Sequence, residues 1–511
     1  MERDSIYKVR VFGYCLDDNE KLLNKFLSNG PKSLLGLPGD YVIVIENKDE
    51  TFLISSTYAV NQYYYAVDNG RFYHSDTVMA ILKMGAIKWE WNWQALADFA
   101  RMGQVLENDT LHKKVFRVPA SSILHFKGGK LDVRTVDWND LYPKTDSTPE
   151  IALKAFNREV EYWVKEDSIV SISAGFDSRT ILSSVLKTGC RPLLLATGSD
   201  KSTEVQISKS IAKSLGLNIQ QVILDINDYL EYGEQITLLT NATKPACDWH
   251  TFIYPKKANL DSQRTFFVGT NGEFVRSAYL NKGIVARIAD IIPSLSLPYF
   301  WKRKLKPKFT EDEINGMNPE FAVDFSGQRQ KERLSRLMNL CHNQMLPGLD
   351  RFFLEQRIRS FHGNGLKMNN ASLQTRLPYL SKDWVVACWN LNRGWKLGEN
   401  SHRYAIIENY PKLLNFPEAK TGNIMAPKAA AFYWTKAKRI KGLVPYADYD
   451  NWFRGDLITS FILDNASVLS ELISKETVYK IVEDHKNHNN RLSVIAFMLP
   501  MIYWLKNTKY I

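Results

Sequence analysis

Paired cysteines, a leader segment and long apolar runs are what this sequence of 511 residues has least of. Its five cysteines are scattered and form no Cys-x-x-Cys pair, which argues against a disulfide framework or a zinc site. No basic-then-apolar leader opens the chain, and the longest apolar stretch, Val494 to Leu505, is too short to span a bilayer and contains Pro500. We therefore expect a cytoplasmic protein with no membrane span.

Two common nucleotide-binding signatures do not fit the most informative segment, Ile169 to Ser178. It is neither the phosphate loop that ends in Gly-Lys-Ser/Thr nor the three-glycine dinucleotide fingerprint, so an ordinary kinase or dehydrogenase is disfavoured. A β-branched run ends in Ser173, Gly175 allows a close turn, and a helical pattern follows to Leu186. This order of strand, turn and helix offers backbone N–H groups and the positive end of a helix dipole to an anion.

Side chains in the same segment add to this predicted phosphate cradle. Ser173 and Ser178 supply hydroxyl donors, and Asp177 supplies a carboxylate suited to hold Mg²⁺ beside phosphates. The segment therefore predicts a cradle for a pyrophosphate group with Mg²⁺. The alternative is a polar strand-to-helix turn of another α/β domain, in which Asp177 only caps the helix.

The charge of the chain favours anionic ligands. Lys and Arg number 66 against 55 Asp and Glu, which gives a formal net charge of +11. Such an excess is usually spread over a solvated surface, so we expect no nucleic-acid partner. One concentrated run, Trp301 to Lys308, is either solvated or a clamp for a phosphorylated or otherwise acidic substrate, or for anionic lipid.

Hydrophobic patterning predicts two domains, residues 1–142 and 150–511. The segment between them, Leu141 to Pro149, combines two prolines with small polar residues and is predicted to be a linker. Short β-rich runs before it predict a sandwich-like β domain with few helices; they are Tyr41–Ile45, Thr51–Ser55, Gln62–Ala66 and Arg71–His74. The alternating Trp89, Trp91 and Trp93 are predicted to pack the domains together.

After the linker the pattern changes to alternating strands and helices. The predicted strands are Ser168–Ser173, Pro192–Thr197 and Gln220–Leu224, with helices to Lys187 and over Thr203–Leu215 between them. A βαβαβ unit of this kind implies a parallel sheet with helices on its faces. Beyond about residue 330 the sequence is mainly helical. The fold class expected is thus α/β and α+β in two domains.

The two halves together resemble asparagine synthetase and its relatives, including β-lactam synthetase and lasso-peptide cyclases, over nearly the whole chain. Gly39–Ile45 and Phe72–Asp76 resemble the Ntn-type glutaminase domain of that family. Ser173–Ser178 resembles the PP-loop of ATP pyrophosphatases, Ser-Gly-Gly-x-Asp-Ser. Three more segments match the family in order: Gly269–Phe274, Gln374–Leu380 and Glu418–Gly422.

The resemblance implies a fold and a chemistry. A degenerate glutaminase-like β-sandwich would precede a PP-loop domain of the adenine nucleotide α-hydrolase type with a helical C-terminal part. The family cleaves ATP between its α and β phosphates to adenylate a carboxylate, which ammonia or an amine then captures. Asp177 and Glu273 would hold Mg²⁺, and Lys420 would be catalytic. The residues expected to bind nucleotide are Ser171, Ser173, Ala174, Gly175, Asp177, Ser178, Thr197 and Gly269.

The chain departs from the family pattern at several places. Ala174 replaces a glycine, Glu273 replaces an aspartate, and Phe274 replaces the next acid, which leaves fewer carboxylates for a metal. Active glutaminase domains carry cysteine directly after the initiator methionine, whereas this chain begins Met1-Glu2-Arg3. We therefore expect no glutamine hydrolysis.

Three functions follow from this sequence. The favoured one is an AMP-forming amide ligase that adenylates a small-molecule or peptide carboxylate and uses ammonia or an amine. The second is a peptide macrolactam cyclase of the lasso type, and the third is a scaffold that keeps the fold without turnover. An oligomer or a pathway partner is compatible with each. Lys420 has the alternative of being an ordinary surface lysine.

Overall fold

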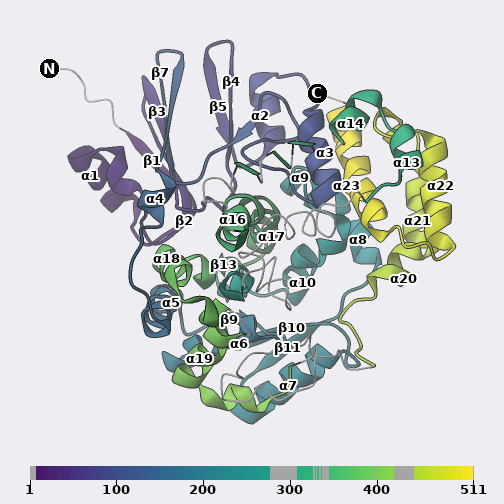
Figure 1. The fold of residues 1–511 in the computed structure, drawn as a ribbon. Helices are drawn as coiled ribbons and strands as arrows, with labels where there is room; N and C mark the ends of the chain where they lie inside the picture. Colours follow the sequence, from purple (N-terminus) through teal and green to yellow (C-terminus); the bar gives the residue numbers. More distant parts are fainter. Residues whose placement is uncertain are drawn as a thin grey trace.

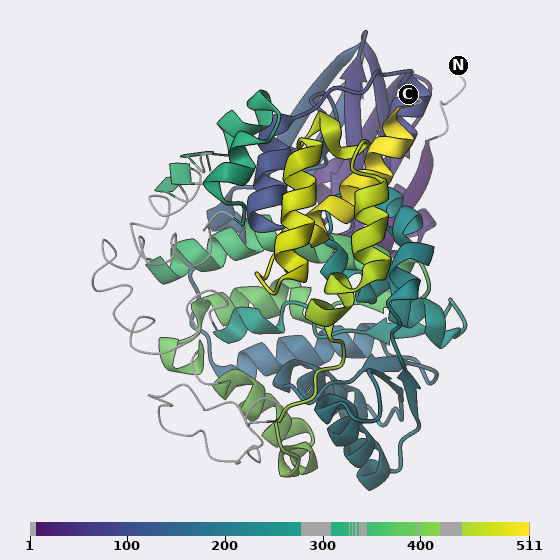
Figure 2. The ribbon, with the colours of Figure 1, turned by 90° about the vertical axis from the view of Figure 1, so that its right-hand side faces the viewer.

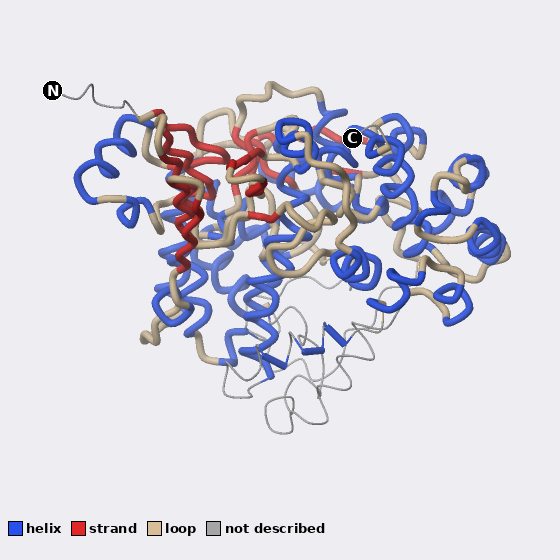
Figure 3. The backbone as a smooth tube through the Cα atoms, turned by 90° about the horizontal axis from the view of Figure 1, so that it is seen from above, coloured by secondary structure: helices blue, strands red, loops and turns tan. Residues whose placement is uncertain are grey.

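The fold is mixed α/β, with two antiparallel sheets, one parallel sheet and many helices (Figure 1). The computed structural model describes residues 7–276, 308–325, 328–329, 331–332, 335–336, 345–396, 399–418 and 442–509. Within this described part, the sheets occupy one side and most helices the other when the molecule is seen from above (Figure 3).

Two antiparallel sheets form the first part of the chain. The larger has the order β1 (Lys8–Cys15), β2 (Gly39–Glu46), β3 (Glu50–Ser55), β7 (Ser122–Lys127) and β8 (Lys130–Thr135). The smaller has the order β5 (Arg71–Ser75), β4 (Tyr64–Asp68) and β6 (Phe116–Arg117). All four predicted strands of this part are confirmed, with bounds shifted by one or two residues.

Strand β2 explains how these layers pack. Its residues are buried on both faces, as the run of apolar residues requires. Tyr41 and Ile43 face α1 (Asn19–Asn29), whereas Val42 and Val44 pack against Tyr65 and neighbouring side chains of the smaller sheet. Each face therefore belongs to a different hydrophobic cluster, and the two sheets lie face to face as a sandwich does.

Helices connect the sandwich to the rest of the chain. Those of the first part are α2 (Val78–Gly85), α3 (Trp93–Met102) and α4 (Trp138–Leu141). Residues 143–148 form neither helix nor strand, as predicted for a linker, and α5 (Pro149–Trp163) begins after the N-cap Thr148. Whether this linker separates two domains stays a prediction, because one continuous hydrophobic cluster contains buried residues from both sides of it.

A parallel sheet of five strands follows, with the order β11 (Ile219–Val222), β10 (Leu193–Thr197), β9 (Ile169–Ser171), β12 (Thr265–Phe267) and β13 (Gln374–Arg376). Every pair of neighbours is parallel, which confirms the prediction of a parallel sheet. The helices between its strands are α6 (Phe176–Lys187), α7 (Thr203–Leu215), α8 (Asn227–Glu231), α9 (Gly233–Leu239) and α10 (His250–Ala258).

The later part of the chain is mainly helical, as predicted. Its helices are α13 (Glu311–Asn315), α14 (Pro319–Asp324), α16 (Met345–Phe352), a π-helix (Phe353–His362), α17 (Gly363–Asn370), α18 (Lys382–Asn390), α19 (Asn400–Asn409), α20 (Tyr449–Arg454), α21 (Asp456–Asp464), α22 (Lys475–Lys486) and α23 (Leu492–Thr508). Figure 2 shows α23 beside α21 and α22, reaching back towards the antiparallel strands. No helix among the described residues is long and apolar enough to cross a membrane.

The tryptophans predicted to join the two parts do so. The ring centres of Trp89 and Trp504 lie 5.4 Å apart, which joins the sandwich to α23. The indole N–H of Trp91 donates to Glu471, and the ring of Trp93 stacks near Phe321. The interface therefore combines apolar ring contacts with a hydrogen bond for a buried indole.

A second contact between the parts is polar and buried. Gln62 donates from Nε2 to the carbonyl oxygens of Arg359 and Ser360, at 2.8 and 3.0 Å, and so bonds carbonyls of the π-helix. Lys367 of α17 donates to the carbonyl of Asp76, and its Nζ lies 4.7 Å from the centre of the Tyr64 ring. Burial lowers the pKa of Lys367 to about 7.

Lys367 makes stability depend on pH in a defined direction. Its pKa lies near 7 in the folded protein and near 10.5 when the chain is unfolded. Between these values the unfolded state binds more protons, so stability rises with pH. We predict that, from pH 7 to pH 10, the free energy of unfolding of the wild type increases relative to that of Lys367→Met, measured by urea unfolding. Lys83→Met, at an exposed position of α2, is the control; a difference that stays constant with pH contradicts the prediction.

Candidate functional site

The order of the parallel sheet indicates where a ligand binds. From β9 the chain moves to β10 on one side, whereas from β12 it moves to β13 on the other. Strands β9 and β12 are neighbours, so the loops after them diverge at the carboxyl edge of the sheet. A crevice at such a topological switch point is the usual ligand site of open α/β sheets.

The predicted phosphate cradle is the loop after β9. Strand β9 ends at Ser171, and α6 begins at Phe176 with Gly175 as its N-cap. The hydroxyl of Ser178 accepts from the backbone N–H of Ser173 at 3.1 Å, and the two hydroxyl oxygens lie 3.0 Å apart. The two serines therefore close the loop on itself at the N-terminal end of the helix.

Two small residues of this loop, Ala174 and Gly175, adopt backbone conformations that do not require glycine. Gly175 has a φ of −90°, so its backbone conformation does not require glycine, and an added Cβ would contact only Ser173 Oγ, at 3.4 Å. Ala174 is fully buried, and its φ is not positive, so its methyl group is accommodated without backbone strain.

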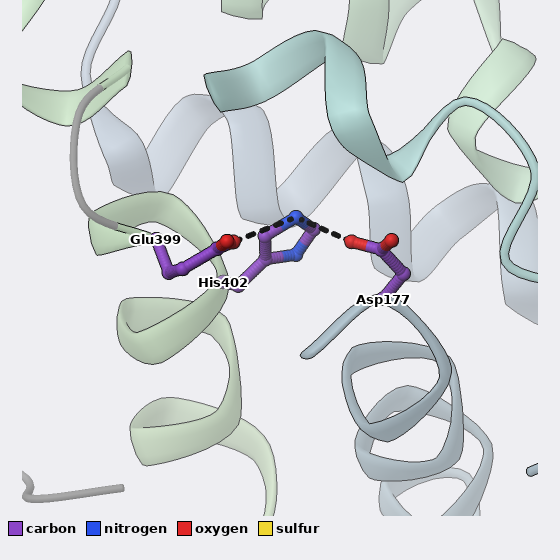
Figure 4. Close-up of side chains that lie close together, drawn as sticks. All are labelled: Asp177, Glu399 and His402. Carbon is purple, nitrogen blue, oxygen red and sulfur yellow. Dashed lines mark ion pairs between the residues drawn. The ribbon is translucent and has the colours of Figure 1, made fainter. Parts of the chain in front are cut away.

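Asp177, the second residue of α6, is the centre of a polar network (Figure 4). Its carboxylate lies 2.9 Å from Arg276 and 3.0 Å from Nε2 of His402. Arg276 also pairs with Glu399, at 2.8 Å, and Nε2 of His402 lies 3.9 Å from Glu399. Burial opposes ionisation of Arg276, but the two carboxylates outweigh it and raise the pKa of the guanidinium.

Three elements position this network. Asp177 comes from α6, Arg276 from the short helix Gly272–Arg276 after β12, and Glu399 and His402 from the start of α19. Nε2 of His402 also lies 2.9 Å from the carbonyl oxygen of Gly272, and the hydroxyl of Tyr379 donates to the backbone carbonyl of Asp177 at 2.9 Å. The site thus joins segments that are far apart in the sequence.

Glycines on the loop after β12 allow this close approach. A Cβ at Gly269 would lie 3.1 Å from Cβ of Asp177, and a Cβ at Gly272 would lie 2.6 Å from its Cγ. Gly269, which was predicted to bind nucleotide, therefore packs against Asp177. Any side chain at Gly272 would push the Asp177 carboxylate out of its place.

The second predicted metal ligand, Glu273, lies in a different environment. Its carboxylate pairs with Nε2 of His362 at 3.4 Å, at the end of the π-helix. Burial opposes ionisation of Glu273, but the interaction with the nearby His362 outweighs it and lowers the pKa of the carboxyl group. Phe274, where the family carries another acid, is fully buried against Trp384.

The described residues that could share a cation are therefore not the predicted pair. Ligand atoms of Asp177, Glu399 and His402 lie within 4.8 Å of one another, whereas Glu273 is not part of this group. Arg276 already forms ion pairs with both carboxylates of this group, those of Asp177 and Glu399. Mg²⁺ prefers oxygen ligands and commonly binds through one or two carboxylates together with phosphates. The carboxylates of Asp177 and Glu399 are therefore the members of this group that suit Mg²⁺.

Sequence reasoning missed Arg276, Glu399 and His402. The sequence does contain a signal for Arg276, because it is a cation three residues after the predicted metal ligand Glu273. Glu399 and His402 belong to no motif, and only the fold brings them to Asp177. Their spacing of three places them on one face of α19, which is the only signal in the sequence.

Ser171 and Thr197, both predicted to bind nucleotide, lie at the carboxyl ends of neighbouring strands. Ser171 is the last residue of β9 and pairs with Leu195 of β10, and Thr197 is the last residue of β10. After Thr197, Gly198 has a φ of +124°, and a Cβ there would meet Cβ of Tyr446 at 2.9 Å.

The predicted catalytic residue Lys420 lies outside the described residues, and so does most of the basic run Trp301–Lys308. The chain just before Lys420 is anchored to α6. The fully buried Arg179 donates to the carbonyl oxygens of Leu413 and Phe416, at 3.3 and 2.8 Å. Burial lowers the pKa of Arg179 to about 10. Arg179, which makes this buried contact, lies two residues after Asp177.

No protein-family model matches the chain, and a search of curated proteins found no significant match. The resemblance to the asparagine synthetase family therefore stays a prediction from the motifs.

The packing at Gly272 gives a testable prediction. Gly272→Ala is expected to displace Asp177 from Arg276 and to lower the free energy of unfolding by about 1–3 kcal/mol, as overpacking of a filled site does. Chemical denaturation measures this. Gly365→Ala in α17 is the matched control, because its Cβ would meet only the Thr251 methyl group at 3.8 Å. Equal stability of the two variants contradicts the prediction.

Proposed function

We propose that this protein is an ATP-dependent ligase that forms AMP and pyrophosphate. It adenylates a substrate carboxylate and transfers ammonia or an amine to it without hydrolysing glutamine. The observation that carries the proposal is the position of the serine-lined loop Ser173–Ser178 and Asp177 at the switch point between β9 and β12. A helix N-terminus at the carboxyl edge of a parallel sheet suits the phosphates of a nucleotide.

The proposed reaction has two steps. An oxygen of the substrate carboxylate attacks the α-phosphorus of ATP, which forms an acyl-adenylate and releases pyrophosphate. The nitrogen of ammonia or an amine then attacks the acyl carbon, an amide bond forms, AMP leaves, and the nitrogen loses a proton. Backbone N–H groups at the start of α6 and the hydroxyls of Ser173 and Ser178 bind the pyrophosphate portion.

Charged residues of the site have separate roles in this proposal. Asp177 and Glu399 would hold Mg²⁺, which supplies charge neutralisation for the phosphates when bound. Arg276 orients both carboxylates through its two ion pairs, and His402 fixes the loop after β12 through the carbonyl of Gly272. Lys420 would stabilise negative charge on the α-phosphate and on the tetrahedral intermediate.

The pairing of the two carboxylates proposed to hold Mg²⁺ with a guanidinium favours a second candidate. Asp177 and Glu399 both pair with Arg276, whereas the predicted ligand Glu273 lies beside His362. A scaffold that binds nucleotide without turnover would keep such pairs. The macrolactam cyclase is the third candidate, and it differs from the ligase only in having the amine on the substrate itself.

Product analysis tests these candidates. Carboxylic acids and peptides are incubated with Mg·ATP and ammonia or amines, and nucleotides are separated by chromatography. AMP and pyrophosphate are expected, with an amide product; a lactam from a single peptide identifies the cyclase. Formation of ADP and phosphate contradicts both, and no turnover with any acid supports the scaffold.

Variants assign the residues in that assay. Lys420→Ala is expected to lower the rate about 10²–10³-fold, as loss of one fixed charge at a transition state does. Asp177→Asn, which keeps the shape of the side chain, is expected to abolish Mg·ATP-dependent turnover. The control is Asp464→Asn on the exposed surface of α21, which should keep the wild-type rate. An unchanged rate for Lys420→Ala refutes its catalytic role.

A further inference from the structure

Two basic side chains contact the ring of Phe361, and a third lies close by. Nζ of Lys244 lies 3.3 Å from the ring centre, and the guanidinium carbon of Arg357 lies 4.0 Å from it. Lys308 is half-buried near Pro245, since a Cβ at Gly103 would meet both side chains, and it lies within electrostatic reach of Arg357 and of Asp248. Among the described residues, none of these three cations has a carboxylate within 4.0 Å, so the cluster lacks ion pairs.

Lys244 is the least satisfied of the three. Only 3% of the surface of this residue is exposed. One of its three N–H donors bonds to the carbonyl of Phe361, at 3.1 Å, and no other acceptor is found among the described residues. Burial lowers the pKa of Lys244 to about 8 and also lowers the pKa of Lys308. A buried ammonium group without a counter-ion is costly unless a ligand supplies one.

The other buried cations of the site are satisfied by the protein itself. Arg276 has two carboxylates, and Arg179 has backbone carbonyls. Lys367 also lacks an ion pair, but it is a single cation with a carbonyl and the Tyr64 ring as partners. Beside Phe361, by contrast, two cations contact one ring and Lys308 lies near them, with Asp248 as the nearby acid.

This cluster lies on the same edge of the sheet as the phosphate loop. Phe361 directly precedes His362, which pairs with Glu273 of the loop after β12. Lys244 precedes α10, and Gln220, near the start of β11, donates to the carbonyl of Ala258 at the C-terminal end of α10, at 2.8 Å. The N-terminal end of α10, beside the cluster, is therefore at the carboxyl edge of the sheet.

We propose that Lys244, Lys308 and Arg357 form a subsite for an anionic group of the substrate. Three positive charges against the single charge of Asp248 leave an excess that suits a dianion. The carboxylate that is activated would then belong to a molecule with a second acidic group, either a phosphate or another carboxylate. The role as substrate subsite rests on the proposed ligase function, whereas the binding of an anion there does not.

Calorimetry with inorganic phosphate and with succinate tests the subsite. Each anion is titrated into the wild type, Lys244→Gln, Asp177→Ala and the control Lys256→Gln, which removes a charge from the exposed face of α10. At least one anion is expected to bind the wild type, Asp177→Ala and Lys256→Gln equally, and Lys244→Gln at least tenfold more weakly. Binding of phosphate alone indicates a phosphorylated substrate, and binding of succinate alone indicates a second carboxylate.

Other outcomes overturn the proposal. They are the absence of anion binding to the wild type, binding that Asp177→Ala but not Lys244→Gln removes, and a tenfold loss of Mg·ATP affinity in Lys244→Gln, which would assign the cluster to the nucleotide. Arg357→Gln replaces Lys244→Gln if thermal unfolding shows that the latter does not fold. Phosphate binding that depends on Lys244 in a protein that binds no Mg·ATP supports the subsite and refutes the ligase.

Discussion

The contact of Arg276 with both Asp177 and Glu399 is the constraint on which the candidate site depends. It joins the first turn of α6, the loop after β12 and the start of α19, three segments that the sequence separates by about 100 residues each. Removing one partner of a fully buried ion pair costs about 3–5 kcal/mol. The cost is smaller here, because 20% to 25% of each side chain is exposed. The glycine opposite Asp177 permits this contact, since a side chain at Gly272 would occupy the space of the Asp177 carboxylate.

Residues near this contact differ from the motifs that the chain resembles. Phe274 contributes to the core instead of supplying an acid, and Glu273 is held by His362. Glu399 provides a carboxylate near Asp177 from another direction. Glu399, a residue of no motif, thus adds a second carboxylate beside Asp177, and Arg276 offsets the repulsion between the two.

Local pattern predicted most of the fold. Helix α7 has the predicted bounds, because its apolar spacing is regular and Gly216 ends it. Strand β9 is shorter than predicted, since the chain leaves the sheet after Ser171 to form the loop. The network around Asp177 and the cluster around Lys244 could not be predicted, because their members meet only through the packing of distant segments. A buried lysine and a surface lysine look the same in a sequence.

A crystal structure with Mg²⁺ and the non-hydrolysable analogue α,β-methylene-ATP would show whether the loop Ser173–Ser178 binds phosphates. The β and γ phosphates are expected at the N-terminal end of α6, within hydrogen-bond distance of Ser173 and Ser178. A magnesium ion is expected on the carboxylate of Asp177. A nucleotide bound elsewhere, or bound with Asp177 contacting neither metal nor phosphate, would refute a nucleotide site at this loop.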